Sequence, residues 1–139
     1  MIIDAVREYI KTCPSLSGKK VNINCLGTKN HSFTIDNVAS DAVIKKYCDG
    51  SELKQAVFTL GVRDRYDETL GENLYVITLL EKIEDWIYKQ NIIKNLPILE
   101  SDDITARSIE VTKSGHLHDT SMGSGRWQLE FRIVYKQSA

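Results

Sequence analysis

Residues 72–97 read ENLYVITLLEKIEDWIYKQNIIKNLP, and this stretch decides the fold. Its apolar residues recur at the three- and four-residue spacing of one helical face. The apolar stripe comprises Val76, Leu79, Leu80, Ile83, Trp86 and Ile87, and the polar side comprises Glu81, Lys82, Glu84, Asp85, Lys89 and Gln90. We therefore predict a long helix from about Glu72 to Ile92, ended by Asn95 and Pro97.

A helix with one apolar stripe needs a surface to cover, and the strand pattern near the C-terminus provides one. Residues 127–135 read WQLEFRIVY, in which aromatic or aliphatic residues occupy every second position from Trp127 to Tyr135, against the polar residues Gln128, Glu130, Arg132 and Lys136. This period of two predicts a strand with one buried face. Ile109 and Val111 alternate in the same way and predict a strand before it.

The middle of the chain carries the strongest hairpin signal. Asp49-Gly50 follows the segment from Val43 to Cys48 and predicts a tight turn. The alternating apolar residues of a long strand come next, at Ala56, Phe58, Leu60 and Val62. For the segment before the turn, a helical turn over Asp41 to Tyr47 is the alternative, because that segment does not alternate cleanly.

The N-terminal part predicts a helix followed by two strands. From Ile2 to Thr12 the apolar residues share one helical face, and Pro14 stops the helix. The apolar residues that then alternate with polar ones are Val21, Ile23 and Cys25, and later Phe33 and Ile35. We predict two antiparallel strands here, joined by a polar loop.

These elements define an α+β fold. The segment from Ser114 to Ser124 is rich in glycine, serine and histidine, and we predict a flexible hairpin connection there. The order helix, strands, long helix, strands predicts a mainly antiparallel sheet with an N-terminal helix and one long central helix packed on one face. With 139 residues, the chain is predicted to form a single domain, residues 1–139.

Composition excludes several classes of function. The formal net charge of -1 argues against general electrostatic binding to nucleic acid. The cysteines, Cys13, Cys25 and Cys48, are far apart and odd in number, which favours free thiols in a reducing compartment. No signal region and no stretch of the ~20 apolar residues that a bilayer requires is evident, so we expect a cytosolic protein without a membrane partner.

Few residues are candidates for catalysis or for metal binding. His116 and His118 flank Leu117, so on a strand both imidazoles would point to one side and could share a zinc ion, with Asp119 or His31 as a third ligand. Their polar, loop-like setting favours solvated histidines instead. The glycine-rich run lacks the Gly-Lys-Ser/Thr ending of a phosphate loop. We therefore expect no catalytic residue, no cofactor and no metal.

Positive charge is modestly concentrated around the central hairpin. The residues concerned are Lys45, Lys46, Lys54, Arg63 and Arg65. They could contact an acidic neighbour or DNA, and a solvated strand face explains them at least as well. The cysteines at predicted strand and helix-end positions are interpreted as small buried hydrophobic residues.

Four stretches of the chain resemble one family. They are VREYIKTCP at residues 6–14, YCDGSELKQ at 47–55, EKIEDWIYKQNIIKNLP at 81–97 and SIEVTKSGHLHD at 108–119. In this order they resemble small tail proteins of phages and prophages of Gram-positive bacteria, often called minor capsid or minor tail proteins. The architecture is also similar to that of lambda-type tail terminators, α+β proteins that form hexameric rings.

The resemblance implies a structural subunit of a virion or phage-like tail, assembled in the bacterial host cytoplasm. Its implied role is to cap the head-proximal end of the tail tube as a ring, a hexamer in the lambda-type family, and to join the tube to the neck. The implied partners are further copies of the chain, the tail tube protein and the head-tail connector. The family contributes no catalytic residues to carry over.

Ring closure needs contacts in which one patch meets a different patch on the next copy. We predict that polar loops supply these patches and are mobile in the free protein. The candidate interface residues are Gly27, Lys29, His31, Asp49, Gly50, Ser51, His116, His118 and Gly123.

Three rival functions remain open at this point. The chain could be a head-completion or neck protein, or a tube subunit, of the same particle. It could be a small acyltransferase, although the His-His-x-x-x-Asp-Gly motif of trimeric antibiotic acetyltransferases does not match the spacing of His116, His118 and Asp119. It could also be a regulatory module that docks a partner through the stripe around Trp86, although packing of that stripe on the sheet is the better interpretation.

Overall fold

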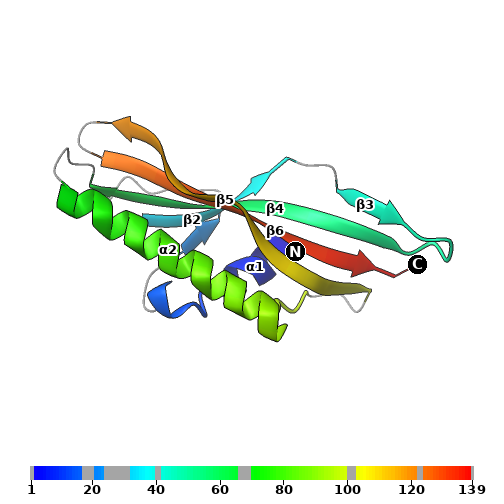
Figure 1. Ribbon diagram of the computed structural model, residues 1–139. Helices are drawn as coiled ribbons and strands as arrows, with labels where there is room; N and C mark the ends of the chain where they lie inside the picture. Colours follow the sequence, from blue (N-terminus) through cyan, green and yellow to red (C-terminus); the bar gives the residue numbers. More distant parts are fainter. Residues whose placement is uncertain are drawn as a thin grey trace.

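The computed structural model describes residues 2–16, 21–23, 32–39, 42–65, 70–99, 103–121 and 124–138. These residues form two α-helices, one short 3-10 helix and six strands (Figure 1). In chain order they are α1 (Ile2–Ile10), η1 (Pro14–Leu16), β1 (Val21–Ile23), β2 (Ser32–Val38), β3 (Val43–Lys46), β4 (Glu52–Arg65), α2 (Leu70–Ile93), β5 (Ile104–Ser121) and β6 (Ser124–Gln137). The predicted α+β class is confirmed.

The strands form one sheet in the order β1-β2-β4-β6-β5. β6 pairs along the whole of β4, whereas β2 and β3 share the other side of β4 in succession. All pairs except β1 with β2 are antiparallel. Both helices lie on the same face of the sheet (Figure 1), as the sequence predicts.

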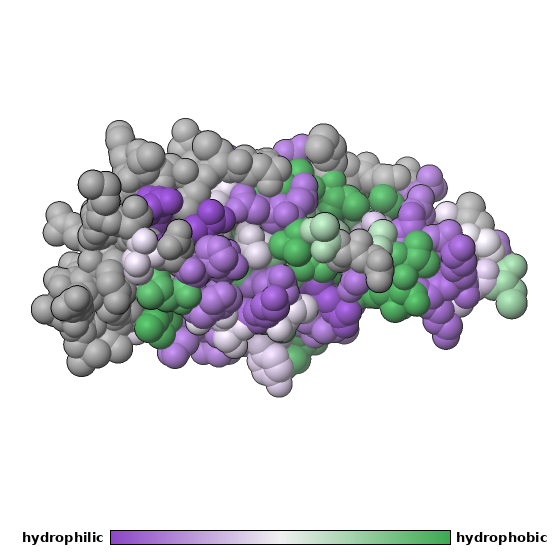
Figure 2. All heavy atoms as spheres, turned by 90° about the horizontal axis from the view of Figure 1, so that it is seen from above, coloured by the Kyte–Doolittle hydropathy of each residue, from purple (hydrophilic) through white to green (hydrophobic). Residues whose placement is uncertain are grey.

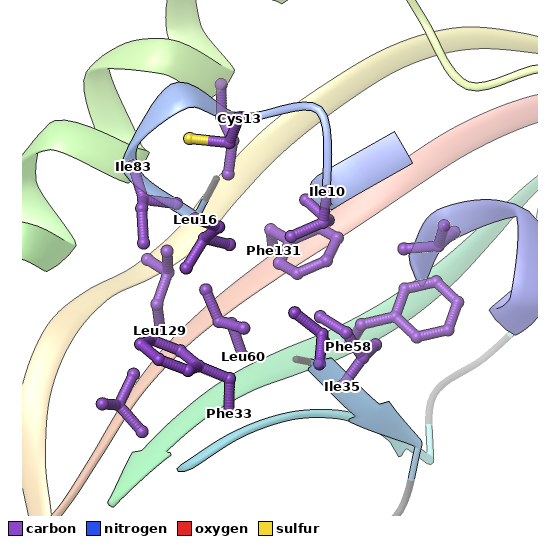
Figure 3. Close-up of a cluster of buried hydrophobic side chains, with 14 of the residues drawn as sticks. Ile10, Cys13, Leu16, Phe33, Ile35, Phe58, Leu60, Ile83, Leu129 and Phe131 are labelled. Atoms are coloured by element: carbon purple, nitrogen blue, oxygen red, sulfur yellow. The ribbon is translucent and has the colours of Figure 1, made fainter. Parts of the chain in front are cut away.

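The core lies between the helices and this face of the sheet (Figure 3). The alternations predicted for β4 and β6 have their apolar residues inside: Phe58 and Leu60 on β4, and Leu129 and Phe131 on β6, are buried. From the helical layer, the buried side chains that meet them include Ile10, Leu16 and Ile83. Burial of apolar area at roughly 25 cal/mol per Å² is the main force that holds the two layers together.

The long helix matches its prediction closely. α2 spans Leu70–Ile93, and its apolar stripe is buried or partly buried. Just after its end, Lys94 adopts a positive φ of 58°. The Lys94 N–H donates to the Asn91 carbonyl at 3.3 Å and the Asn95 N–H donates to the Gln90 carbonyl at 3.0 Å. These two bonds are those of a Schellman motif, which satisfies carbonyls at the helix end.

Tyr9 connects the two helices. Its ring lies 5.2 Å from the Trp86 ring, centroid to centroid, and its hydroxyl donates to the Asn95 carbonyl at 2.7 Å. Burial is the main reason that the pKa of Tyr9 rises to about 12. Trp86, considered above as a docking residue, is therefore packed against α1.

The predicted direction of the first two strands is wrong. β1 and β2 pair in parallel, with Val21 opposite Phe33. Residues 24–31 separate them and can span up to about 26 Å, whereas a three-residue strand is only about 10 Å long. The connection is therefore long enough to allow parallel pairing of β1 and β2, and antiparallel pairing is not required.

The loop predicted from Ser114 to Ser124 is also wrong for most of its length. β5 continues to Ser121 and pairs with β6 as far as Ser124. Register shifts between Lys113 and His116 and between Leu117 and Asp119 accommodate the irregular sequence. Pairing with a long, strongly apolar partner strand outweighs the turn-like local composition. The helical alternative before the central turn is likewise wrong, because Val43–Lys46 is strand β3.

Candidate assembly surfaces

One end of the sheet extends beyond both helices (Figure 1). This end, which we call the arm, consists of residues 43–54 with the ends of β5 (104–106) and β6 (135–137) that continue their sheet. All four residues of β3 are exposed, so this strand has no buried face. Val43, Ile44 and Tyr47 are nevertheless apolar, with exposed fractions of 39%, 45% and 38%.

The turn of the arm is built by residues that the sequence singles out. The Gly50 N–H donates to the Tyr47 carbonyl at 3.1 Å, and the Tyr47 N–H donates to the Ser51 carbonyl at 2.9 Å. Gly50 has a φ of 90°, which a residue with a Cβ rarely adopts. The Asp49 carboxylate accepts hydrogen bonds from the Ser51 hydroxyl at 2.6 Å and its N–H at 2.9 Å. These bonds lower the pKa of Asp49.

Positive charge surrounds the aromatic ring of the arm. The Nζ atoms of Lys45 and Lys136 lie 5.3 and 5.4 Å from the centroid of the Tyr47 ring, within cation-π range. Lys46 is exposed beside them. The arm therefore combines exposed apolar side chains with lysines. Of the basic residues predicted to cluster, Arg63 and Arg65 lie at the far end of β4 and do not belong to the arm.

Strand β5 forms one edge of the described sheet, and α2 packs along it. The Asn91 side-chain oxygen accepts from the Ile109 N–H at 3.2 Å, and Glu84 Oε1 accepts from the Gly115 N–H at 2.8 Å. Two edge amides are thus satisfied by side chains of the helix. A Cβ on Gly115 would lie 2.7 Å from Leu80, so the helix approaches the strand as closely as it does because this residue is glycine.

A groove of about 510 Å³ lies between α2 and β5. We define the groove by six of its lining residues: Glu84, Asp85, Tyr88, Ile109, Glu110 and Val111. Its lining contains three carboxylates and neither lysine nor arginine. Arg132 lies 3.2 Å from Glu110 and neutralises part of this charge. The groove is therefore acidic, with apolar residues in its lining. The side chain of Tyr88, which also lines it, is 68% exposed.

Where Figure 2 shows it in colour, the face of the sheet opposite the helices combines hydrophilic side chains with several hydrophobic patches. Polar side chains pair across its strands: Arg126 with Asp36 at 3.1 Å, Arg132 with Glu110 at 3.2 Å, and Thr112 with Glu130 at 2.7 Å. Partly exposed pairs of this kind contribute little stability each, on the order of 0–1 kcal/mol. This face resembles the solvated side of an antiparallel sheet.

The predicted interface residues fall into three groups. Asp49, Gly50 and Ser51 lie together in the turn of the arm. His116 and His118 lie on β5, far along the chain from that turn. The predictions for Gly27, Lys29, His31 and Gly123 lie outside the described residues.

The two described histidines are exposed on β5. The Nδ1 atom of His116 lies 2.8 Å from the Ser114 carbonyl oxygen. The alternation that would place both imidazoles on one side is interrupted, because the register shifts between Leu117 and Asp119. Across the part of the chain that the structure describes, no three His, Cys, Asp or Glu side chains are grouped to hold a metal ion.

The thiols differ in setting. Cys13 is buried, as predicted, and burial raises the pKa of its thiol, which disfavours the reactive thiolate. Cys48 is exposed in the turn of the arm, so its interpretation as a buried residue is wrong. The prediction for Cys25 lies outside the described residues.

The search for relatives gave no match to a protein-family model and none to a curated protein sequence. In the described ranges, neither helix combines the length and apolarity needed to cross a bilayer.

Sequence reasoning located the arm through Asp49-Gly50 and missed the groove. The groove depends on how α2 and β5 approach each other, and these elements come from different parts of the chain. Gly115 carries a signal for it, since a glycine within a strand often marks a close approach. That signal was hidden because the surrounding composition predicted a loop.

Proposed function

We propose that this chain is a structural subunit of a phage or phage-like tail, and that it is the tail terminator, which caps the head-proximal end of the tail tube as a ring and joins it to the neck. The observation that carries the proposal is the arm. β3 has no buried face, yet Val43, Ile44 and Tyr47 are exposed apolar side chains. Apolar surface exposed next to a strand edge is typical of surfaces that another chain covers.

Two further points support the proposal. The α+β fold with both helices on one face agrees with the fold that the resemblance to lambda-type terminators implies. The resemblance also extends over most of the chain in the same order, from residues 6–14 to residues 108–119. The proposed action is purely structural: the chain presents shape and charge to copies of itself, to the tube protein and to the connector.

Negative-stain electron microscopy of the purified chain tests this proposal. A terminator forms closed rings over a range of concentrations, whereas a tube subunit forms long cylinders as the concentration rises. Deleting the gene from its phage or prophage distinguishes the remaining rival. Loss of a terminator gives tails of uncontrolled length, whereas loss of a neck protein leaves tails of normal length that do not join heads.

The outcome that contradicts a structural role is enzymatic turnover. A thiol-release assay with acetyl-coenzyme A tests the acyltransferase alternative directly. Turnover that disappears in the His116→Ala or His118→Ala variant would overturn the proposal.

A further inference from the structure

Two surfaces of this chain complement each other, although they cannot meet within one copy. The arm lies at one end of the sheet, and the groove lies beside α2 along the β5 edge (Figure 1). We infer that the arm of one copy seats in the groove of the next copy. This inference rests on the proposed function, since it identifies the contact through which copies would join.

Complementary charge is the first reason to infer that the arm binds in the groove. Lys45 and Lys136 place positive charge around Tyr47, and Lys46 adds an exposed charge on β3. The groove has the carboxylates of Glu84 and Asp85 in its lining, whereas the Glu110 carboxylate is paired with Arg132 at 3.2 Å on the opposite face of the sheet. Surfaces of opposite charge attract each other before contact and fix the register of the contact.

Exposed apolar surface on both the arm and the groove is the second reason for this inference. Val43, Ile44 and Tyr47 are exposed apolar residues of the arm, which extends beyond both helices (Figure 1). The groove has Ile109 and Val111 in its lining, together with the exposed Tyr88. Its volume of about 510 Å³ is within the range of natural binding sites and can accept an aromatic side chain with its neighbours.

The hydrogen bonds of β5 determine how the arm binds. The Ile109 and Gly115 amides already donate to Asn91 and Glu84 of α2. Because these groups are occupied, β3 does not extend the sheet at this segment as an added strand. The contact is made by side chains, with Tyr47 against the apolar lining residues and the lysines against the carboxylates.

The contact is heterologous, because the two patches are different parts of the surface. Each copy then has a free arm and a free groove, and copies add head to tail. Such a series either closes into a ring or continues as a filament. A ring is the closed assembly that the proposed function requires.

Cys48 offers a direct test, since this exposed cysteine lies in the turn of the arm next to Tyr47. A second cysteine in the groove, Tyr88→Cys, should form an intermolecular disulfide with Cys48 under mild oxidation. Disulfides need Cα atoms about 4.4–6.8 Å apart, so the cross-link reports close seating. The matched control is Lys89→Cys, which is the next residue on α2, also exposed and outside the groove lining.

We expect Tyr88→Cys to give a ladder of covalent oligomers on a non-reducing gel, with at least about fivefold more product than Lys89→Cys. Adding Cys48→Ser to Tyr88→Cys should remove the ladder. Equal products from Tyr88→Cys and Lys89→Cys in a chain that forms rings would overturn the inference and leave the proposed function standing. A product that stops at a dimer would also overturn it, because it indicates a symmetric contact. A chain that forms neither rings nor ladders contradicts both proposals.

Charge reversal provides a second measurement on the same variant. Lys45→Glu/Lys46→Glu should lower the yield of the Tyr88→Cys ladder by about tenfold, which is the effect of losing about 1.4 kcal/mol of interaction. Asp85→Lys in the same chain should restore part of the yield. The control is Lys11→Glu/Lys82→Glu, which makes the same charge change at two exposed positions outside both surfaces, one just after α1 and one on α2. An equal loss in this control would show that net charge, and not the arm, drives association, and would overturn the inference.

Discussion

The body and the arm of this protein share one sheet, yet different forces hold them. In the body, β4 and β6 carry side chains such as Leu60 and Phe131 that are completely buried beneath the helices. In the arm, the same two strands continue beyond the helices, and β3 beside them has every residue exposed. The body is therefore stabilised mainly by buried apolar area. In the arm Tyr135 is buried, and β3 depends on strand pairing and on the turn at Asp49-Gly50.

This difference indicates which parts of the chain can present side chains to other molecules. A segment that contributes little to the core can present apolar and charged side chains without weakening the fold. The arm does this with Tyr47 and its two neighbouring lysines. The predictions below compare the two regions, beginning with the largest effect on stability.

The largest difference should come from shortening one large side chain in each region. Phe131→Ala leaves a cavity among fully buried side chains and should lower the free energy of unfolding by about 3–5 kcal/mol. Tyr47→Ala, in the arm, should change it by less than about 0.5 kcal/mol. Urea denaturation followed by circular dichroism measures both. Similar losses in the two variants would show that the arm is part of the cooperative core.

The contact between α2 and β5 should be nearly as sensitive. In Gly115→Ala the new Cβ would lie 2.7 Å from Leu80, so the helix must move away from the strand. We expect a loss of about 2–3 kcal/mol, typical of overpacking. Ser114→Ala, at the exposed neighbouring position, is the control and should be within about 0.5 kcal/mol of the parent chain. A tolerated Gly115→Ala would mean that the groove can widen easily.

These two effects also show where sequence reasoning succeeds. The burial of Phe131 follows from the alternation of residues 127–135, and α2 follows from the stripe that includes Ile83, because both patterns are local. The turn at Gly50 was likewise evident from its dipeptide. Local patterns were sufficient for these elements because propensity, period and turn chemistry agree.

The features that were missed depend on contacts between separate elements of the chain. The strand character of Gly115 to Ser121 comes from pairing with β6, and the parallel pairing of β1 follows from where the chain returns. The groove requires Glu84 and Asn91 to reach the amides of β5. No pattern within a single segment specifies such contacts, and so the sequence predicted the arm but not its proposed binding site.

Alkaline pH should affect the body through Tyr9. Its pKa is raised to about 12 in the folded chain, so between pH 10 and 12 the unfolded chain loses its proton first. The unfolded state then binds fewer protons, and stability falls as the pH rises through this window. The loss from this residue should be roughly 1–3 kcal/mol.

Comparing the parent chain with Tyr9→Phe isolates this contribution. Burial also raises the pKa of Tyr135, and that group adds a loss of the same sign in both proteins. Tyr9→Phe should be less stable at pH 8, because the Asn95 carbonyl loses its donor. It should also show a shallower decline from pH 10 to 12. Parallel curves for the two proteins would mean that Tyr9 ionises normally in the folded state.

The smallest expected change in global stability is in the arm, and it tests the comparison most closely. Gly50→Ala places a Cβ on a residue with a φ of 90°, which should cost about 1 kcal/mol locally. If the arm opens independently of the body, hydrogen exchange at the Tyr47 and Gly50–Ser51 amides should accelerate about fivefold while the melting temperature remains almost unchanged. If the melting temperature instead falls by the several degrees that a global loss of about 1 kcal/mol produces, the arm and the body unfold together. The separation between a stable body and an independently opening arm would then not exist.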